Sequence, residues 1–466
     1  MSARGGAEVR TLEDFASWAR RGAEGLTFAG PDPHHGIGLH ALVPGYRIVT
    51  IDDAPALDVL RANGVEAYAL AAAESPGELS RSSQTLLADP GARAFLDARA
   101  VTRLLVFKSS HGIETECRRR GWSLLAAPAV VARRWENKVA FRSLAGELGL
   151  PQPAGEIVDL SETPYADVAR RLGARLVVQS AHGYGGNRTL AADDAEGWAA
   201  AVARLKAGHA RVTARVDGLP LTLNACVTAR GVAVGAPCVQ LTGEPELTPY
   251  PLGSCGNDWC AAGSLDLPVA ALVALAERVG EALAGDDYRG IFGLDLVLTE
   301  DGEPFVIEVN PRLVASIALY TQLEVLAGRL PLLARHVLAF LAPDLDDAPL
   351  DAHLGPVAGA QVILHNIAPR PIGVTSRVAA GVYRHESGGG LTLARPAATV
   401  DRLASPDEIL LLPPAAGRHP APGTELARLQ TRGTVTGPDG CLLPGIAEAV
   451  RIVRARLGAF PGPTGG

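Results

Sequence analysis

The sequence predicts a multidomain chain that combines α/β and α+β architecture. Its 466 residues are too many for one ordinary domain, so we expect three or four domains. Over roughly the first 125 residues, short apolar runs alternate with amphipathic stretches, a pattern typical of a small α/β unit. From about residue 358 the chain is rich in glycine and proline, and its short β-like runs favour a β-rich C-terminal domain.

Composition argues against several classes of protein. Hydrophobic residues make up 47% and charged residues 20% of the chain, as in an average folded globular protein. The formal net charge of −7 disfavours electrostatic binding of nucleic acid. No run of 18 apolar residues occurs without a charge, and the charged first 20 residues are unlike a secretory signal, so no membrane partner is expected. Six cysteines do not make a disulfide framework, so we expect a cytoplasmic protein.

The N-terminal unit contains strand candidates at residues 26–30, 46–51 and 104–107. The first strand runs into a loop that contains Gly36 and Gly38. Since these glycines do not form the G-x-G-x-x-G pattern, the sequence does not favour a dinucleotide site there.

The rest of the chain alternates helices and strands. A helix is predicted at 137–148, ended by Gly149 with Pro151 beyond. Further elements are expected as strands at 175–179, 211–216 and 221–228, and as helices from 193 to 205, at 269–283 and at 446–457. A polar stretch at 343–354 predicts a linker. We expect four units, at residues 1–127, 128–217, 218–342 and 358–466.

Lysine is scarce in this chain. Of 43 basic residues, only Lys108, Lys138 and Lys206 are lysine. A compact ammonium cannot always be replaced by a guanidinium, so a lysine retained in this background is a candidate for chemistry. Lys138 opens the predicted helix that follows Trp135. The alternative is an ordinary solvated lysine.

The most informative segment is residues 291–312, where two β-like runs flank Asp301-Gly302, a strong hairpin signal. If that dipeptide forms the turn, Asp295 lies directly opposite Glu308, and Asn310 shares their face. Two opposed carboxylates repel each other unless a cation lies between them. Hard oxygen ligands favour Mg²⁺ or Mn²⁺. The alternative is a solvent-facing hairpin with ordinary surface acids.

Pro311 and Arg312 follow the second strand directly. The proline restrains the chain as it leaves the strand and directs the Arg312 guanidinium toward the metal end of the hairpin. An arginine beside a metal–phosphate site can stabilise negative charge in a transition state.

A second segment places a glycine-rich loop after a strand, His182-Gly183-Tyr184-Gly185-Gly186-Asn187. Glycines allow backbone N–H groups to approach phosphate oxygens closely. The loop is not a Walker A motif, since no Gly-Lys-Ser/Thr follows, and a flexible hairpin loop is the alternative.

Together, Lys138, the glycine-rich loop and the set Asp295, Glu308, Asn310 and Arg312 resemble the ATP-grasp superfamily over about residues 128–330. The hairpin is similar to that of carbamoyl-phosphate synthetase, biotin carboxylase and amino-acid ligases. The overall layout is similar to the pheganomycin-type peptide ligases. The resemblance implies an ATP-grasp fold with a small N-terminal pre-ATP-grasp domain.

The same resemblance implies the cofactors and their contacts. ATP would lie between two α+β lobes, with Lys138 and the loop residues 182–187 at its phosphates, and the acids would hold two Mg²⁺ ions. The family often carries a second lysine where this chain has Gln179, which can donate a hydrogen bond to phosphate or adenine but brings no charge. Arg188 or the metals could offset that loss. Asp217 stands near the position of the family's ribose-binding acid.

Two further groups are candidates for substrate contacts. The segment from Cys255 to Cys260 has a composition suited to a binding loop, with Asp258 as its polar contact, and its cysteine spacing disfavours zinc. A C-terminal group suits carboxylate recognition, with ordinary surface residues as the alternative; its members are His365, Arg370, Arg377, Arg384 and His385.

The resemblance to the ATP-grasp superfamily implies an ATP-dependent carboxylate–amine ligase. It would form an amide or peptide bond between an amino acid or small carboxylic acid and an amine or peptide, through an acylphosphate, with release of ADP and phosphate. Arg312 and Lys138 are the expected catalytic residues. One alternative is a carboxylase or carbamoyl transferase that phosphorylates bicarbonate. Another is a nucleotide-binding regulator with weakened catalysis, for which Gln179 is the support. Family members are often homodimers.

Overall fold

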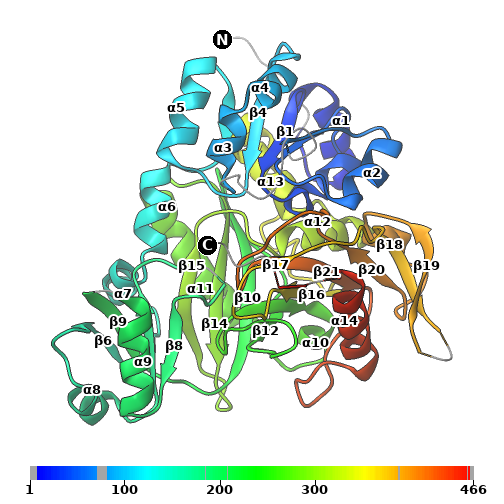
Figure 1. Ribbon diagram of the computed structural model, residues 1–466. Helices are drawn as coiled ribbons and strands as arrows, with labels where there is room; N and C mark the ends of the chain where they lie inside the picture. Colours follow the sequence, from blue (N-terminus) through cyan, green and yellow to red (C-terminus); the bar gives the residue numbers. More distant parts are fainter. Residues whose placement is uncertain are drawn as a thin grey trace, which may run out of the picture.

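The computed structural model describes residues 8–70, 81–183, 185–206, 208–386, 389–458 and 460–461. It confirms a multidomain chain of mixed α/β and α+β architecture, built on a parallel sheet, a small antiparallel sheet and a large antiparallel sheet. Figure 1 shows the N-terminal unit at the top, a lobe with α8 and α9 at the lower left, and the C-terminal strands with α14 at the lower right.

The N-terminal unit is a five-stranded parallel sheet in the order β3-β2-β1-β4-β5. Its strands are β1 Leu26–Gly30, β2 Arg47–Thr50, β3 Glu66–Ala69, β4 Arg103–Val106 and β5 Ser123–Leu125. The helices are α1 Leu12–Gly22, α2 Pro55–Ala62, α3 Ser83–Ala88, α4 Pro90–Asp97 and α5 His111–Arg120. The strand order changes direction between β1 and β4, and the carboxyl ends of such a pair form a crevice suited to a ligand. The loops after these two strands therefore meet at one edge.

The small lobe is a four-stranded antiparallel sheet in the order β6-β9-β7-β8, with its own buried core. Its strands are β6 Gly155–Asp159, β7 Leu176–Ser180, β8 Thr189–Ala192 and β9 His209–Ala214. After α6 Ala129–Glu136, the helices are α7 Lys138–Glu147, α8 Tyr165–Leu172 and α9 Ala195–Leu205. The strand expected at 175–179 and the helix expected at 137–148 are confirmed as β7 and α7.

The large sheet has 11 strands in the order β15-β14-β10-β12-β13-β16-β21-β20-β18-β19, with β11 paired to β10. The first part comprises β10 Leu219–Thr228, β11 Gly231–Val234, β12 Cys238–Thr242, β13 Ser254–Asp258, β14 Gly290–Leu298 and β15 Pro304–Asn310. The C-terminal part comprises β16 Ala360–His365, β18 Gly381–His385, β19 Leu391–Pro396, β20 Ile409–Leu412 and β21 Glu425–Thr431. Pairing of β13 with β16 joins the two parts, so the C-terminal segment extends the sheet that carries the β14–β15 hairpin. The division into four units remains a prediction.

Helices cover this sheet and connect it to the N-terminal unit. They are α10 Trp259–Gly263, α11 Val269–Gly285, α12 Ile317–Leu326, α13 Leu332–Leu341 and α14 Pro444–Arg456. A small second sheet pairs β17 Ile372–Gly373 with β22 Phe460–Pro461. The largest core cluster contains residues of β1, α12, α13 and β18, so the N-terminal unit and the large sheet share one hydrophobic core. The small lobe packs its interior separately.

The polar stretch at 343–354, expected to be a linker, is anchored to α13 instead. Arg335 is fully buried and pairs with Asp346 at 3.0 Å between Nε and Oδ2. It also donates to the backbone oxygens of Ala348 and Pro349. A buried guanidinium requires such partners, and they fix the stretch against the helix.

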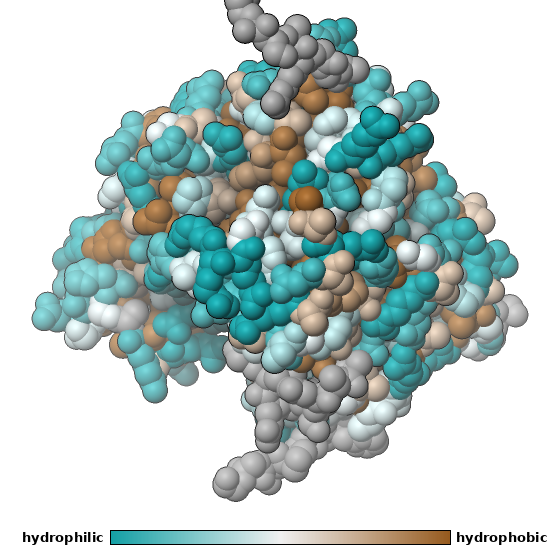
Figure 2. Space-filling view, turned by 90° about the horizontal axis from the view of Figure 1, so that it is seen from above, coloured by the Kyte–Doolittle hydropathy of each residue, from teal (hydrophilic) through white to brown (hydrophobic). Residues whose placement is uncertain are grey.

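Among the described residues, no helix is both long and apolar enough to cross a membrane. The face in Figure 2 is largely hydrophilic, with groups of apolar residues between the charged side chains.

Candidate functional site

The hairpin β14–β15 places the predicted metal ligands together. Asp295 pairs with Glu308 and Gly293 pairs with Asn310, so the two carboxylates and the amide lie on one face, as predicted. Asn310 donates from Nδ2 to Oδ2 of Asp295 at 3.0 Å. The neighbouring strands contribute Thr222 and Gln240, which both donate to Oδ1 of Asp295.

The turn itself differs from the predicted two-residue turn. Gly302 donates from its backbone N–H to the Thr299 oxygen at 3.0 Å and has a φ of +80°, so it follows the turn in the left-handed conformation. Near the turn the pairing is therefore shifted by one residue. A β-bulge at Ile307 removes this shift and restores Asp295 opposite Glu308. The Ile307 carbonyl accepts a hydrogen bond from Nη1 of Arg211 at 2.9 Å, which satisfies a group that the bulge leaves out of the ladder.

The electrostatics of the hairpin fit a cation. Burial and the nearby Glu308 carboxylate raise the pKa of Asp295 to about 6. Glu308 is neutralised on its other side by Lys138, whose Nζ lies 2.8 Å from Oε2. Two carboxylates and one amide oxygen are the donor types that Mg²⁺ and Mn²⁺ prefer, so the residues present fit a divalent ion.

Lys138 is buried at the first position of α7, where the Asn137 side chain caps the helix. Its backbone N–H donates to the Ala181 oxygen at 2.9 Å, which links the helix start to the glycine-rich loop. Through its ion pair with Glu308, the Lys138 ammonium lies next to the predicted metal ligands.

Arg312 is held by several partners. Its Nε donates to Oε1 of Glu136 at 2.8 Å, and its Nη2 donates to Oδ1 of Asn310 at 2.8 Å. The Phe107 ring flanks the guanidinium, with 5.2 Å between Cζ and the ring centroid. Glu136 also pairs with Lys108, so two of the three lysines lie at this site. The scarcity of lysine in the sequence therefore pointed to Lys108 as well as to Lys138, but only Lys138 was predicted as a site residue.

The glycine-rich loop lies against the large sheet. Gly185 and Gly186 have φ values of +54° and +79°. A Cβ on Gly186 would lie 2.4 Å from Cα of Gly253, so only glycine permits this close approach between the lobes. Tyr184 lies outside the described residues.

A cavity of about 720 Å³ lies between the small lobe, the large sheet and the N-terminal unit. Most of the predicted site residues line it, namely Gln179, Gly185, Gly186, Asp217, Asp295, Glu308, Asn310 and Arg312. The other predicted residues, Lys138, His182, Gly183 and Asn187, are not among its lining residues. The volume is within the range of small-molecule and cofactor sites.

Sequence reasoning missed Arg211. It lies on β9 directly across from Gln179 on β7, lines the cavity and is only 2% exposed. Its Nε is buried without a hydrogen-bond partner among the described residues. Burial lowers its pKa to about 10, and the Glu308 carboxylate opposes that shift. Such a guanidinium brings positive charge to the position where Gln179 brings none.

Asp217 lies at the rim of the cavity. Its side chain is 68% exposed and forms an ion pair with Arg175, with 2.7 Å between Oδ1 and Nη2. The Arg175 hydrogen bond lowers the pKa of Asp217.

The segment from Cys255 to Cys260 is ordered structure rather than the expected binding loop. Residues 254–258 form β13, and α10 begins at Trp259. Asp258 is fully buried, caps α10 and accepts hydrogen bonds from the Thr434 hydroxyl and the Val435 N–H. It therefore cannot contact a substrate, and the adjacent Asn257 lines the cavity in its place.

The C-terminal basic group does not form one site. His365 lines the cavity, whereas Arg377 pairs with Asp58 of the N-terminal unit. Arg384 donates to Oε1 of Glu408 at 2.8 Å, and His385 lies near Glu448. Arg370 is exposed. The strands of the large sheet separate these residues, which sequence proximity could not reveal.

Comparison with known proteins agrees with this geometry. Residues 136–316 match the ATP-grasp domain family. No curated protein matches the chain. The biotin carboxylase domain of Hydrogenobacter thermophilus 2-oxoglutarate carboxylase, solved with MgADP, ADP and bicarbonate, is similar over 88% of this chain and 86% of that one, with 13% identity and a TM-score of 0.59.

Two carboxyaminoimidazole enzymes show the same fold. One is N5-carboxyaminoimidazole synthase from Aspergillus clavatus, solved in complex with ADP and 5-aminoimidazole ribonucleotide. The similarity covers 93% of this chain and 98% of that one, with 13% identity and a TM-score of 0.54. The Thermus thermophilus N5-carboxyaminoimidazole ribonucleotide synthetase covers 92% and 98% at 17% identity and a TM-score of 0.55. At these identities the similarity establishes the ATP-grasp fold.

The opposed carboxylates generate a prediction that does not depend on turnover. Asp295→Asn removes one of two repelling charges, so at pH 7 without metal we expect a higher thermal unfolding midpoint than for the wild type. Mg²⁺ should raise the midpoint of the wild type and leave that of Asp295→Asn unchanged. Because the pKa of Asp295 is raised to about 6, repulsion is absent once the carboxyl is protonated, and the difference between the metal-free proteins should shrink below pH 6.

The exposed hairpin acid Glu300 provides a matched control, since Glu300→Gln removes a charge outside the site. An equal Mg²⁺ shift in the wild type and in Asp295→Asn would contradict the assignment of Asp295 as a metal ligand.

Proposed function

From the ATP-grasp domain at residues 136–316, we propose that this chain is an ATP-dependent carboxylate–amine ligase. It forms an amide or peptide bond between an amino acid or small carboxylic acid and an amine or peptide. The observation that carries this proposal is the set of Asp295, Glu308, Asn310 and Arg312 on one wall of a single large cavity.

ATP binds in this cavity. The rim beside Asp217 and Arg175 suits the nucleoside, whereas Arg211, Gln179 and the glycines 185 and 186 suit the phosphates. The Arg211 guanidinium supplies the charge that Gln179 lacks. The unpartnered Nε of Arg211 supports this role, since a buried donor without a partner is costly until a ligand satisfies it.

Mg²⁺ or Mn²⁺, when bound, neutralises charge on the phosphates. Asp295, Glu308 and Asn310 would hold the ions through oxygen atoms. Lys138 shares Glu308 and provides a second cation beside the transferring phosphoryl group.

In the first step a substrate carboxylate oxygen attacks the γ-phosphorus of ATP, the bond to ADP breaks, and an acylphosphate forms. An amine then attacks the acyl carbon, and phosphate leaves with the original carboxylate oxygen. Arg312 stabilises the oxyanion of this second step, and its contacts with Glu136, Asn310 and Phe107 fix the guanidinium in advance. The contact between Gly186 and Gly253 suits a loop that closes over the acylphosphate and excludes water.

A second candidate function is phosphorylation of bicarbonate. Structural similarity to a biotin carboxylase domain and to carboxyaminoimidazole enzymes favours it. The same cavity, metal ligands and arginine would serve a carboxyphosphate. Positive charge from Arg211 opposite Gln179 favours these two functions over a nucleotide-binding regulator with weakened catalysis.

Release of ADP tests these proposals. Purified protein is incubated with ATP and Mg²⁺ against pools of amino acids, small carboxylic acids and peptides, and against bicarbonate with amines. Mass spectrometry follows the same reactions. A product lighter by one water than its two substrates supports the ligase, and ADP release that depends on bicarbonate supports the second candidate. If neither class of acceptor stimulates ADP release from protein that binds ATP, both proposals are wrong.

The role of Arg312 predicts a defect in the chemical step. With a substrate found in the ADP-release assay, Arg312→Lys should lower kcat by about 100-fold or more, because a lysine ammonium cannot reproduce the planar set of donors of the guanidinium. The KM for ATP should change little. Arg134→Lys, an exposed ion-paired arginine on α6, serves as the control. A kcat within threefold of the wild type would remove Arg312 from the mechanism.

The pair of Arg211 and Gln179 predicts a rescue. Arg211→Met should weaken ATP binding by about 10- to 100-fold, because a charge-assisted hydrogen bond to phosphate is lost. Gln179→Lys in the same chain should recover at least part of the loss, since the two side chains lie directly across from each other. Calorimetric titration with ATP measures both variants, and Arg171→Met on the exposed face of α8 is the control. Wild-type affinity in Arg211→Met would contradict the assignment.

A further inference from the structure

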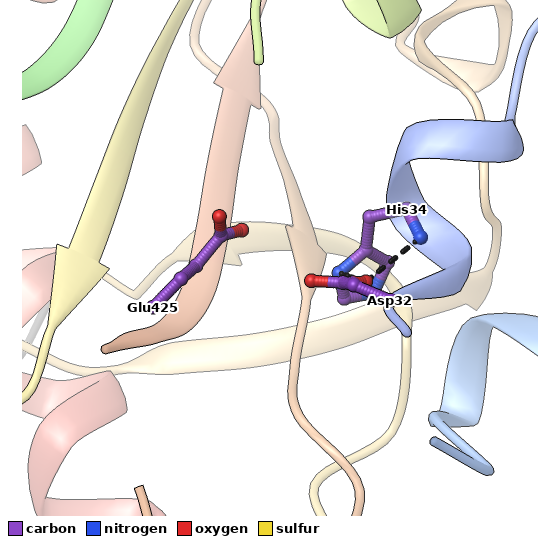
Figure 3. Close-up of side chains that lie close together, drawn as sticks. All are labelled: Asp32, His34 and Glu425. Carbon is purple, nitrogen blue, oxygen red and sulfur yellow. Dashed lines mark hydrogen bonds and ion pairs between the residues drawn. The ribbon is translucent and has the colours of Figure 1, made fainter. Parts of the chain in front are cut away.

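A second group of polar side chains lies beside the cavity, and one of its members lines it. Asp32 and His34 come from the loop after β1, and Glu425 comes from the start of β21, almost 400 residues later in the chain. One atom of each side chain, an oxygen or a ring nitrogen, lies within 4.8 Å of the others. Figure 3 shows Glu425 facing the loop that carries Asp32 and His34. Glu425 lines the cavity, and so does His35, which follows His34 in the chain.

The carboxylate of Glu425 is fixed by Arg428, which is fully buried. The guanidinium forks onto Glu425, with 3.0 Å between Nη2 and Oε2, and its Nη1 donates to the Ala315 oxygen at 3.0 Å. Its Nη2 also donates to Nε2 of His35 at 2.7 Å. The hydrogen bonds of Arg428 thus go to protein groups and hold the Glu425 carboxylate in place. The carboxylate keeps further lone pairs that can accept hydrogen bonds from a ligand.

Both carboxylates are ionised at neutral pH. Burial alone would raise the pKa of Asp32, but His34 and Arg428 hold it well below its ordinary value. Burial is likewise outweighed at Glu425, where Arg428 lowers the pKa. The neighbouring His35 is neutral, since burial lowers its pKa to about 4.

His34 adds a buried ring to the cluster. Its Nδ1 lies 3.1 Å from Oδ1 of Asp32. The residue is 4% exposed, and Nε2 has no hydrogen-bond partner within the described part of the chain. A buried ring nitrogen without a partner points to a polar ligand beside it.

This cluster is close to the reaction centre. The centroids of the His35 and Phe107 rings are 4.3 Å apart. The same Phe107 ring also contacts the guanidinium of Arg312. At one end of the cavity Arg312 and Arg211 adjoin the proposed metal ligands. The Glu425 carboxylate lies at another end, and only the His35 and Phe107 rings are described between this cluster and Arg312.

We propose that the carboxylates of Asp32 and Glu425, beside His34, bind the protonated amino group of a substrate whose carboxylate lies at Arg312. The substrate class is an aminocarboxylic acid with several bonds between its two charged groups, such as an ω-amino acid or a short peptide. The oxygens of the two carboxylates can accept from the three N–H donors of an ammonium. This inference rests on the proposed ligase function, because it assumes that the carboxylate at Arg312 is the one that is phosphorylated.

A divalent metal suits the cluster less well. Arg428 already pairs with Glu425. Two further guanidinium groups lie near the cluster, because Arg81 pairs with Asp52 and Nη1 of Arg418 lies 3.5 Å from Oδ2 of the same aspartate. Guanidinium groups this close repel a dication more than a single ammonium charge. An ammonium held between carboxylates also stays protonated, so the substrate's own amine does not attack its acylphosphate and a second amine must do so.

Calorimetric titration of the full chain, saturated with ADP and Mg²⁺, tests this proposal. The probes are β-alanine, 4-aminobutyrate, 6-aminohexanoate and glycylglycine, each against its counterpart without a free amine: propionate, butyrate, hexanoate and N-acetylglycylglycine. We expect at least one probe with an amine to bind tenfold or more tightly than its counterpart. Glu425→Gln and Asp32→Asn should each abolish this preference and leave ADP affinity unchanged, with Glu300→Gln as the matched control.

Three outcomes would overturn the proposal. No preference for an amine in any pair would exclude an ammonium subsite. An undiminished preference in both variants would place the ammonium elsewhere. Zn²⁺ binding by the wild type that is lost in Asp32→Asn and in Glu425→Gln would assign the cluster to a metal.

The same probes separate this proposal from the ligase function. If an amine-bearing probe binds through Glu425 but no carboxylate stimulates ADP release, the subsite stands and the ligase function fails. If probes with and without an amine stimulate ADP release equally, in the wild type and in Glu425→Gln, the ligase function stands and the subsite fails.

Discussion

The repulsion between Asp295 and Glu308 is the constraint on which the site depends. Antiparallel pairing forces the two carboxylates onto one face of a hairpin, where desolvation makes their charges costly. The surrounding residues offset that cost from several directions, with Lys138 on one side and Asn310, Thr222 and Gln240 on the other. A hairpin built this way is stable with a cation and strained without one, which is the property that a metal–phosphate site requires.

Three parts of the chain converge on this hairpin. The small lobe, with its separate core, contributes Gln179 and Arg211, and the large sheet contributes the proposed metal ligands. The N-terminal unit and the C-terminal strands share a core and together supply His35, Phe107 and Glu425. Because the change of strand order between β1 and β4 brings the loops after these strands to one edge, His35 and Phe107 reach the same cavity.

Local signals in the sequence predicted the hairpin well and the wider site less well. Alternation and the Asp-Gly dipeptide were sufficient to pair Asp295 with Glu308, although the real turn is one residue longer and the bulge at Ile307 restores the register. Arg211 could not be found, because its place opposite Gln179 depends on which strands pair, and no local pattern specifies that. Asp258 was misassigned because an aspartate in a short polar stretch suits a helix cap as well as a binding loop.

The central claim is that the cavity transfers a phosphoryl group to a carboxylate oxygen. Its most direct test is a single-turnover reaction with substrate labelled with ¹⁸O in the carboxylate, followed by mass spectrometry of the released phosphate. An acylphosphate requires that each phosphate carry one ¹⁸O atom, because the carboxylate oxygen leaves with phosphorus when the amine attacks. Unlabelled phosphate, or ¹⁸O recovered in AMP, would contradict the account.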